Sequence, residues 1–460
     1  MRNHLSLLII LPAALLAVAG CSTFDPARTR AEQSRLFRAT LERQASELLA
    51  KPLSLNDCIR IAMTNNYAAR KADLDTEIMR IAKNTAFTAF LPNVTLSAGY
   101  NSHQKAPSPM SEKRFGQASL ETGMPIFMPS VWFLYAAARH GHSAAEMAAN
   151  FVRQGIVLET SQSYYQVLVL QDTVNAIETQ LGAARENAAR IEGLAREGFF
   201  TAWERDQAHL QTEVRQAELD TARRHLEIAR ADLLVTLGLS PIPAADAKYH
   251  LRLSGDTGEP KRPEGTTADL VLTALEGHPM LSIADRRVVM QEHAVRQAFT
   301  AFLPVLNLTA ASTWTGNDLA EHASNWMTAF GGTWKLFSGL ANVARYKAAR
   351  VERRRSELER ESTFLNVMAQ VIAAEAAVND AIEEARIRQR AYEVAAAKHA
   401  DYDARSREGL LPLSDALDAR ADMDLAQVAM VKSRYQERIA LAALDLAMGV
   451  TLVPEAPTDE

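Results

Sequence analysis

Few side chains in this sequence are spaced so that they could carry out chemistry together. The 460 residues contain no P-loop, no glycine-rich dinucleotide motif, no HExxH and no cysteine pair at zinc spacing. Of the eleven histidines only His140 and His142 are close, and residues two apart do not share a helix face. Packing therefore explains this pair, and the scattered methionines, better than metal binding does. The sequence predicts no catalytic residue, no metal site and no enzyme. The formal net charge of −5 also gives no reason to expect nucleic acid binding.

Cys21 has surroundings that predict a covalent modification. Arg2 and His4 precede the apolar run LSLLIILPAALLAVAG, which ends at Cys21, as in an export signal that is removed. The sequence VAGC at residues 18–21 resembles the bacterial lipobox, which implies cleavage after residue 20 and a diacylglyceryl thioether on Cys21. An ordinary signal peptide with an incidental cysteine is the alternative. By resemblance to known lipoproteins, Ser22 favours transport to the outer membrane.

The second cysteine, Cys58, lies among Ile59, Ile61 and Ala62 and is expected to be a small buried hydrophobe. With Cys21 acylated, no intrachain disulfide can form. The sequence predicts no cofactor other than the covalent lipid on Cys21.

The seven residues AFTAFLP occur twice, at 86–92 and at 298–304. The match continues outward at the same offset of 212, for example from Asp57 to Asp269 and from Asp73 to Asp285. Two copies of one unit of about 210 residues are therefore indicated. We divide the chain into a signal peptide (1–20), an N-terminal tether (21–51), repeat 1 (52–238), an equatorial linker (239–266), repeat 2 (267–450) and a C-terminal tail (451–460).

Each AFTAFLP copy ends a helical pattern and begins a run with a period of two residues. Pro92 and Pro304 disfavour helix in the residue before them, and we interpret them as helix-to-strand junctions. The alternating runs predict two β-hairpins, with strands at about 93–100, 117–127, 305–314 and 326–337. Strands of about ten residues are long enough to cross a bilayer when tilted. After residue 20 no apolar run is long enough for a membrane-spanning helix.

Helical patterns fill the rest of each repeat. One continuous helix of about 36 residues is expected to run from residue 54 to residue 90. Helices of nearly seventy residues follow the hairpins, at about 131–197 and 341–408, and each is followed by another of about 36. At 1.5 Å per residue the long helices measure about 100 Å and the short ones about 54 Å, so two short helices match one long one. The predicted fold class is mainly α with a small β part: two tandem repeats of long antiparallel coiled-coil helices, with a β-hairpin in each.

Four strands are too few to close a barrel, and open sheet edges are not tolerated in lipid. Several chains must therefore share one barrel if the strands enter a membrane. Two chains would give eight strands, an interior that side chains fill, whereas three would give twelve strands and a lumen.

This set of features resembles the TolC-like outer-membrane efflux proteins, in particular their lipidated, OprM-like branch. The resemblance covers roughly residues 52–450. It rests on the duplicated helix-FLP-strand passage, on PIF and KLFSG before the long helices, on the REG tripeptides after them and on the LG and MG endings. It implies a homotrimer in the bacterial outer membrane, with a twelve-stranded β-barrel continuous with a periplasmic α-helical tunnel.

By the same resemblance the protein is expected to be the exit duct of a tripartite efflux or secretion system. Its partners would be a periplasmic adaptor (membrane fusion protein), an inner-membrane transporter of the RND or ABC type, and outer-membrane lipid. The alternative is that the chain is itself a periplasmic adaptor or a structural coiled-coil lipoprotein. Adaptors carry one helical hairpin rather than two, and a structural coiled coil does not need four amphipathic strands. The exported substrate is not encoded in any motif.

The two REG tripeptides are predicted to form the periplasmic tip, and the resemblance makes them adaptor contacts. A glycine-capped helix end explains them equally well, and both roles are compatible. The residues concerned are Arg196, Glu197 and Gly198 in repeat 1 and Arg407, Glu408 and Gly409 in repeat 2.

Three acidic residues are placed at the tunnel aperture by the resemblance. Asp415 and Asp418 match the aspartates that ring it, and Glu204 matches an acidic latch position. Three copies of such carboxylates would attract cations and repel anions. Alternatively, Asp415 complements the N-terminus of the last helix. The tyrosine and arginine of the TolC latch are replaced by Ser406 and Leu411, so any latch here must use other partners.

Overall fold

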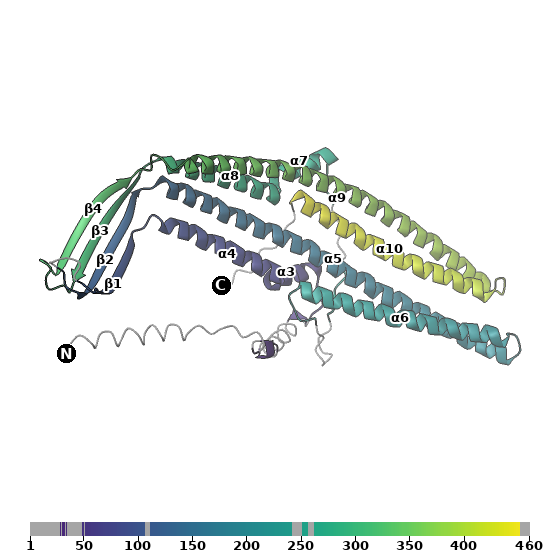
Figure 1. The fold of residues 1–460 in the computed structure, drawn as a ribbon. Helices are drawn as coiled ribbons and strands as arrows, with labels where there is room; N and C mark the ends of the chain where they lie inside the picture. The colour runs from purple at the N-terminus through teal and green to yellow at the C-terminus, as the bar shows by residue number, and fades with distance from the viewer. Residues whose placement is uncertain are drawn as a thin grey trace.

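The computed structural model describes residues 28, 30–32, 34, 48–49, 51–105, 111–241, 251–255 and 262–450. Cys21, the predicted signal peptide (1–20) and the C-terminal tail (451–460) lie outside the described residues, as do most of the tether and parts of the linker. The chain forms an elongated molecule (Figure 1). Four strands lie at one end, and at the other end are two turns, each of which connects a long helix to the next helix.

The two repeats have the same order of elements. Repeat 1 contains α3 (Leu55–Asn65), α4 (Tyr67–Thr88), β1 (Asn93–Ser102), β2 (Arg114–Phe127), α5 (Pro129–Arg196) and α6 (Ala202–Thr236). Repeat 2 contains α7 (Thr267–Gly277), α8 (Pro279–Phe299), the short 3-10 helix η1 (Thr300–Phe302), β3 (Val305–Thr315), β4 (Ser324–Thr333), α9 (Ala341–Arg407) and α10 (Leu413–Met448).

The helices α5 and α9, with 68 and 67 residues, run the full length of the helical part. In repeat 1, α3 and α4 pack on the half of α5 next to the strands, and α6 packs on the other half; α7, α8 and α10 pack on α9 in the same way (Figure 1). The repeats contact each other through α5, which packs against α8 and α10, and through the pairing of β2 with β3. The expected match of two short helices to one long helix is therefore seen in both repeats.

The expected continuous helix between residues 54 and 90 is wrong in one respect, because it is broken at Asn66. This residue leaves the helical conformation (φ −61°, ψ 130°), and its side-chain oxygen accepts hydrogen bonds from the backbone N–H groups of Ala68 and Ala69. His278 breaks repeat 2 at the same offset of 212 (φ −64°, ψ 127°), and its Nδ1 accepts from the N–H of Met280 (3.1 Å). Each break thus supplies the N-cap of the next helix.

Both breaks are buried against the end of the returning helix. Asn66 donates from Nδ2 to the carbonyl oxygen of Thr236 at 2.8 Å. Just beyond α6, Gly238 adopts φ +71°, and a Cβ there would lie 2.3 Å from the carbonyl oxygen of Asn65. Gly449 ends α10 in the same way, at φ +73°, and a Cβ there would lie 3.0 Å from the Cα of His278. Only glycine fits these close approaches. We call the two contacts the equatorial joints.

The linker reaches the first joint. Leu53 and Leu253 form an isolated parallel bridge, in which the Leu53 N–H donates to Arg252 O and the Ser254 N–H donates to Leu53 O, both at 2.9 Å. The buried hydroxyl of Tyr164 on α5 donates to the carbonyl of Ser254. Residues 252–254 of the linker therefore lie at mid-height on α5, whereas Arg262 donates to Asn379 of α9 at 2.8 Å.

The repeated heptapeptide forms the same aromatic cluster twice. Phe87 and Phe90 pack on Tyr135 of α5, with ring centroids 5.8 and 6.3 Å away. Phe299 and Phe302 pack on Tyr346 of α9, at 6.2 and 6.5 Å. Pro92 and Pro304 then directly precede β1 and β3. Each copy thus fixes the end of a short helix to the start of a long one and directs the chain into a strand.

The four strands form one antiparallel sheet in the order β1-β2-β3-β4. Its register places apolar residues opposite one another on one face. Leu96 pairs with Leu120, and Leu308 pairs with both Met124 and Phe330. The other face carries polar residues in register, including Ser97, Ser119, Thr313 and Asn325. The sheet therefore has one apolar and one polar face, and β1 and β4 are its edges.

The predicted fourth strand, 326–337, is wrong at its end because β4 stops at Thr333. Trp334 turns aside and donates from Nε1 to the carbonyl of Phe302 (3.0 Å). Leu340 then adopts a left-handed conformation (φ +65°) immediately before α9. These residues continue the alternating sequence pattern but have left the sheet.

His278 makes the stability of the second joint depend on pH. Burial lowers its pKa from the ordinary value of 6.5, partly opposed by a hydrogen bond to the backbone of Leu446. Because the unfolded chain takes up the proton first, the contribution of His278 is complete above about pH 6.5 and is lost as the pH falls toward the lowered folded-state pKa. Stability should therefore decrease between pH 7.5 and pH 5.

His278→Asn should keep the cap, as Asn66 does in repeat 1, and lose less stability on acidification than the wild type. Thermal unfolding followed by circular dichroism at the two pH values measures this. Some pH dependence should remain, because burial also lowers the pKa of His140 and of His293. The exposed His322 is the control, and His322→Asn should behave as the wild type. An equal pH response in His278→Asn and wild type would contradict the role of the joint.

Candidate functional site

The tip of repeat 1 is a tight turn built on glycine. Helix α5 ends at Arg196, Glu197 is its C-cap, and Gly198 follows with φ +85°. The N–H of Phe199 donates to the carbonyl of Leu194 at 2.9 Å. This is the hydrogen bond of a Schellman C-cap, which requires the left-handed conformation that Gly198 supplies.

The tip of repeat 2 has the same construction. Helix α9 ends at Arg407, Glu408 is the C-cap, and Gly409 has φ +74°. The N–H of Leu410 donates to the carbonyl of Arg405 at 2.9 Å. Both turns lie at the end of the molecule farthest from the strands (Figure 1).

Each turn exposes an apolar residue next to an arginine. Phe199 is 74% exposed and Leu410 is 72% exposed. Arg196 pairs with Glu192 one turn earlier (3.0 Å), and Arg407 pairs with Asp403 (2.6 Å). The REG tripeptides are therefore glycine-capped helix ends, and each is followed by an apolar side chain that is largely exposed among the described residues.

Glu204 lies in the first turn of α6, where it completes a capping box with Thr201. Its Oε2 accepts from the backbone N–H of Thr201 (2.7 Å) and from the Thr201 hydroxyl (2.6 Å). These hydrogen bonds lower the pKa of Glu204. The Glu204 carboxylate therefore caps the N-terminus of its own helix. This capping role was not predicted from the sequence.

Asp415 and Asp418 lie on the first two turns of α10, and both are exposed. The hydroxyl of Ser414 donates to Asp415 Oδ1 at 3.3 Å, so Asp415 also sits where a carboxylate complements a helix N-terminus. Asp418 and Glu204 line one cavity of about 530 Å³ between α5, α6 and α10, and Asp415 does not line it. The structure thus brings two of the three predicted acidic residues together.

The same cavity contains three charged residues that sequence reasoning missed, Asp424 and Arg420 of α10 and Arg215 of α6. Asp424 is only 4% exposed, and burial raises its pKa. Like Ala416 and Ala419, Asp424 lies on the buried side of α10. A carboxylate at a position where the helical pattern expects an apolar residue could have indicated it from the sequence.

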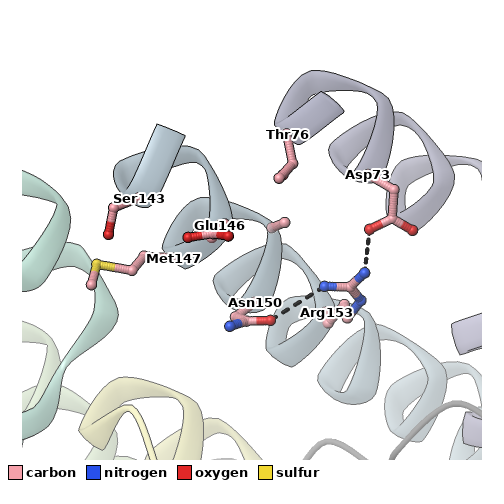
Figure 2. A pocket seen from close by; sticks show the side chains of 8 residues that line it. Asp73, Thr76, Ser143, Glu146, Met147, Asn150 and Arg153 are labelled. Carbon is pink, nitrogen blue, oxygen red and sulfur yellow. Dashed lines mark hydrogen bonds and ion pairs between the residues drawn. The ribbon is translucent and has the colours of Figure 1, made fainter. Parts of the chain in front are cut away.

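A second groove lies nearer the strands, between α4 and α5 (Figure 2). Arg153 donates to Asp73 across it and to Asn150 Oδ1 at 3.2 Å. Asp285, the repeat 2 counterpart of Asp73, accepts from Arg360 of α9 in a similar groove. Exposed ion pairs of this kind contribute at most about 1 kcal/mol, so we interpret them as contacts between helices rather than as a site.

The histidine pair of the sequence is separated in the structure. His140 stacks on His293 of α8, with ring centroids 5.5 Å apart, whereas His142 lies 3.5 Å from Glu146. Within the described ranges, no three histidine, cysteine or acidic side chains gather as metal ligands would. None of the described helices is both long and apolar enough to cross a membrane.

The family model described as outer membrane efflux protein matches residues 59–239 and 270–450. No curated protein matches the chain significantly. Solved structures with the same fold include a membrane protein from Pseudomonas aeruginosa, with 22% identity, a TM-score of 0.73 and coverage of 86% of this chain and 90% of that one.

Two outer membrane channels share the fold as well. CmeC from Campylobacter jejuni has 19% identity and a TM-score of 0.71, over 87% of each chain. The open state of MtrE from Neisseria gonorrhoeae has 19% identity and a TM-score of 0.71, over 88% of this chain and 91% of that one. Because the family model covers both repeats, the chain belongs to the outer membrane efflux protein family.

Proposed function

We propose that this outer membrane efflux protein is a homotrimeric exit duct, which carries substrates from a periplasmic adaptor and an inner-membrane transporter to the outside. The observation that carries the proposal is the sheet, which has one apolar face, one polar face and two unpaired edges. In lipid, edge N–H and C=O groups must be paired, and a closed barrel is the only sheet that achieves this.

Pairing β4 of one chain with β1 of the next satisfies both edges. The apolar face would contact lipid, with Leu96, Trp326 and Phe330 among its exposed residues. The polar face would line the lumen. Strands of 10 to 14 residues have the length that a tilted crossing needs. Three chains supply twelve strands, enough to leave an open interior.

The helices favour the same closed ring. Helix α9, which follows edge strand β4, carries Val351, Leu358, Leu365 and Ile372 at intervals of seven residues, each at least half exposed. We call these four residues the α9 seam. Helix α4, which leads into the other edge strand, exposes Leu74, Ile78 and Ile81. Two different apolar faces on one chain make a head-to-tail interface, which closes into a ring when the rotation from chain to chain adds up to a full turn.

The tip is the part that we assign to the adaptor. Phe199 and Leu410 project from the two turns beside Arg196 and Arg407. Exposed apolar residues with a charged rim are typical of a protein contact surface. The inner-membrane transporter, of the RND or the ABC type, would be reached through that adaptor, and its identity would decide the cargo.

Asp415 and Asp418 would form the aperture of the ring. In three copies, these exposed carboxylates would give a negative constriction on the axis. Glu204 stands beside Asp418 in the same cavity and would add to this field. A broad, solvated lumen has little chemical selectivity of its own, so the charge at the aperture would be its main filter.

The anchor that we propose is a diacylglyceryl thioether on Cys21 after removal of residues 1–20. Its support is the sequence VAGC at residues 18–21. One lipid chain alone gives only marginal membrane binding, whereas several signals together give a stable anchor. Lipid on three chains would therefore strengthen a barrel that already holds the membrane.

The α9 seam can be tested with a charge. Leu365→Glu places a carboxylate in an interface that would have to desolvate it, so the trimer fraction should fall at least about tenfold at equal protein concentration. Heat-dependent gel mobility and mass determination in detergent measure the fraction. Asn366→Glu is the matched control and should leave the trimer intact, because Asn366 is a polar exposed neighbour outside the seam. Equal trimer fractions in both variants would reject the interface.

Ion selectivity tests the aperture. Replacing both Asp415 and Asp418 with alanine should reduce the preference for cations over anions, because it removes six carboxylates from a trimer. Reversal potentials of single channels in planar bilayers, under a salt gradient, measure this preference. Asp206→Asn is the control, since this exposed residue at the same end already pairs with Arg205. Unchanged selectivity in the double variant would rule out the aperture role, and failure of the wild type to conduct would count against the duct itself.

Acylation is tested by Cys21→Ser. This variant should no longer incorporate labelled palmitate, while the trimer still assembles because the strands and helices are unaltered. Membrane fractionation should show weaker anchoring. Incorporation that persists in the variant would exclude Cys21 as the acylation site.

A further inference from the structure

The cavity between α5, α6 and α10 has features of a ligand site within a single chain. At about 530 Å³ it falls within the range of small-molecule pockets. It opens close to the tip, and its walls come from three different helices. All of these walls belong to one chain.

Three buried polar atoms of its lining residues have no hydrogen-bond partner among the described residues: Asp424 Oδ2, Arg420 Nε and Asn187 Oδ1. Leaving such atoms unsatisfied costs roughly 1–3 kcal/mol each, more when the group is charged. Asp424, Arg420 and Asn187 all line this one cavity, so a ligand that enters among these side chains and supplies two donors and one acceptor would match their polar groups.

Asp424 is the most demanding of the three. Burial raises its pKa, and nearby Arg420, His399 and Arg215 oppose this shift only in part. Within the described part of the chain no cation lies within ion-pair distance of Asp424, and Arg215 pairs instead with Glu218 at 2.7 Å. The carboxylate is therefore buried without a partner, a state in which an added cation is strongly favoured.

The lining of the cavity favours an aromatic ligand. Phe200 and Trp203 belong to it, and Trp203 is 65% exposed. Indole and phenyl rings bind both aromatic groups and cations. Glu204 and Asp418 add negative charge to the lining, whereas Arg215 and Arg420 add positive charge. With Asp424 the carboxylates outnumber the arginines, so the charge of the cavity favours cations over anions.

We propose that this cavity binds an aromatic compound with a primary ammonium group and one hydrogen-bond acceptor. The ammonium group would donate to Asp424 and Asn187, the acceptor would receive the Arg420 N–H, and the ring would lie against Trp203. This inference goes beyond the duct, because it assigns a saturable site to each protomer, and binding does not require the proposed trimer.

Dansylcadaverine is a suitable probe, because it carries a primary ammonium, a naphthalene ring and a sulfonamide acceptor. Titration of the purified full-length protein should give a saturable rise in fluorescence with one site per chain. Asp424→Asn should weaken binding at least tenfold. Asp422→Asn is the matched control and should bind as the wild type, since Asp422 lies two residues away and pairs with Lys398 on α9.

Two further measurements separate loss of the site from loss of the fold. Asp424→Asn removes an unpaired buried charge, so its melting temperature should equal or exceed that of the wild type. Trp203→Ala, at an exposed position, should weaken the probe several-fold without changing stability. N-acetylated dansylcadaverine lacks the ammonium charge and should bind at least tenfold more weakly.

Equal affinity of Asp424→Asn and wild type, or of the acetylated and free probe, would overturn the proposal. Its failure can be distinguished from failure of the duct, because single-channel conductance is measured separately. A conducting protein without probe binding would refute only the site. A non-conducting protein that binds the probe would refute only the duct.

Discussion

A sheet of four strands with an apolar face and two open edges cannot remain alone in a membrane. There the backbone groups of β1 and β4 need partners, which the proposed ring supplies by pairing β4 of one chain with β1 of the next. The rest of the molecule is arranged to meet this requirement. The aromatic clusters of the two AFTAFLP copies hold both hairpins at one end of the helices, so that β1 and β3 begin, and β2 and β4 end, at the same level.

Much of this fold could be predicted from sequence, because apolar residues recur at a different spacing in helices than in strands. The bounds of α5 and α9 follow from uninterrupted helical spacing and from the glycines that end it. The breaks at Asn66 and His278 were missed, since a single residue leaves the helix and the helical pattern resumes at once. Pro279 was a usable signal for the second break, because a residue before proline avoids the helical conformation. Trp334 was misassigned because alternation continues past the last ladder pair.

The tip could be predicted only in part. Gly198 and Gly409 are visible as helix ends, and resemblance marked Asp415, Asp418 and Glu204. Which of these meet is decided by the packing of α10 against α5, which no local pattern encodes. Asp424 was missed for the same reason. A carboxylate at a position that the helical pattern assigns to apolar residues could face either solvent or a cavity. Which of these it faces is decided by how α5, α6 and α10 pack together.

The equatorial joints have a consequence for symmetry. Two similar repeats in each of three chains would make the tunnel wall nearly sixfold, with six joints around its waist. Asparagine and histidine would alternate there, so that only every second joint can acquire a proton. Acidification would then add charge at three joints and leave the three between them unchanged. The nearly sixfold ring of joints would become threefold in its charge.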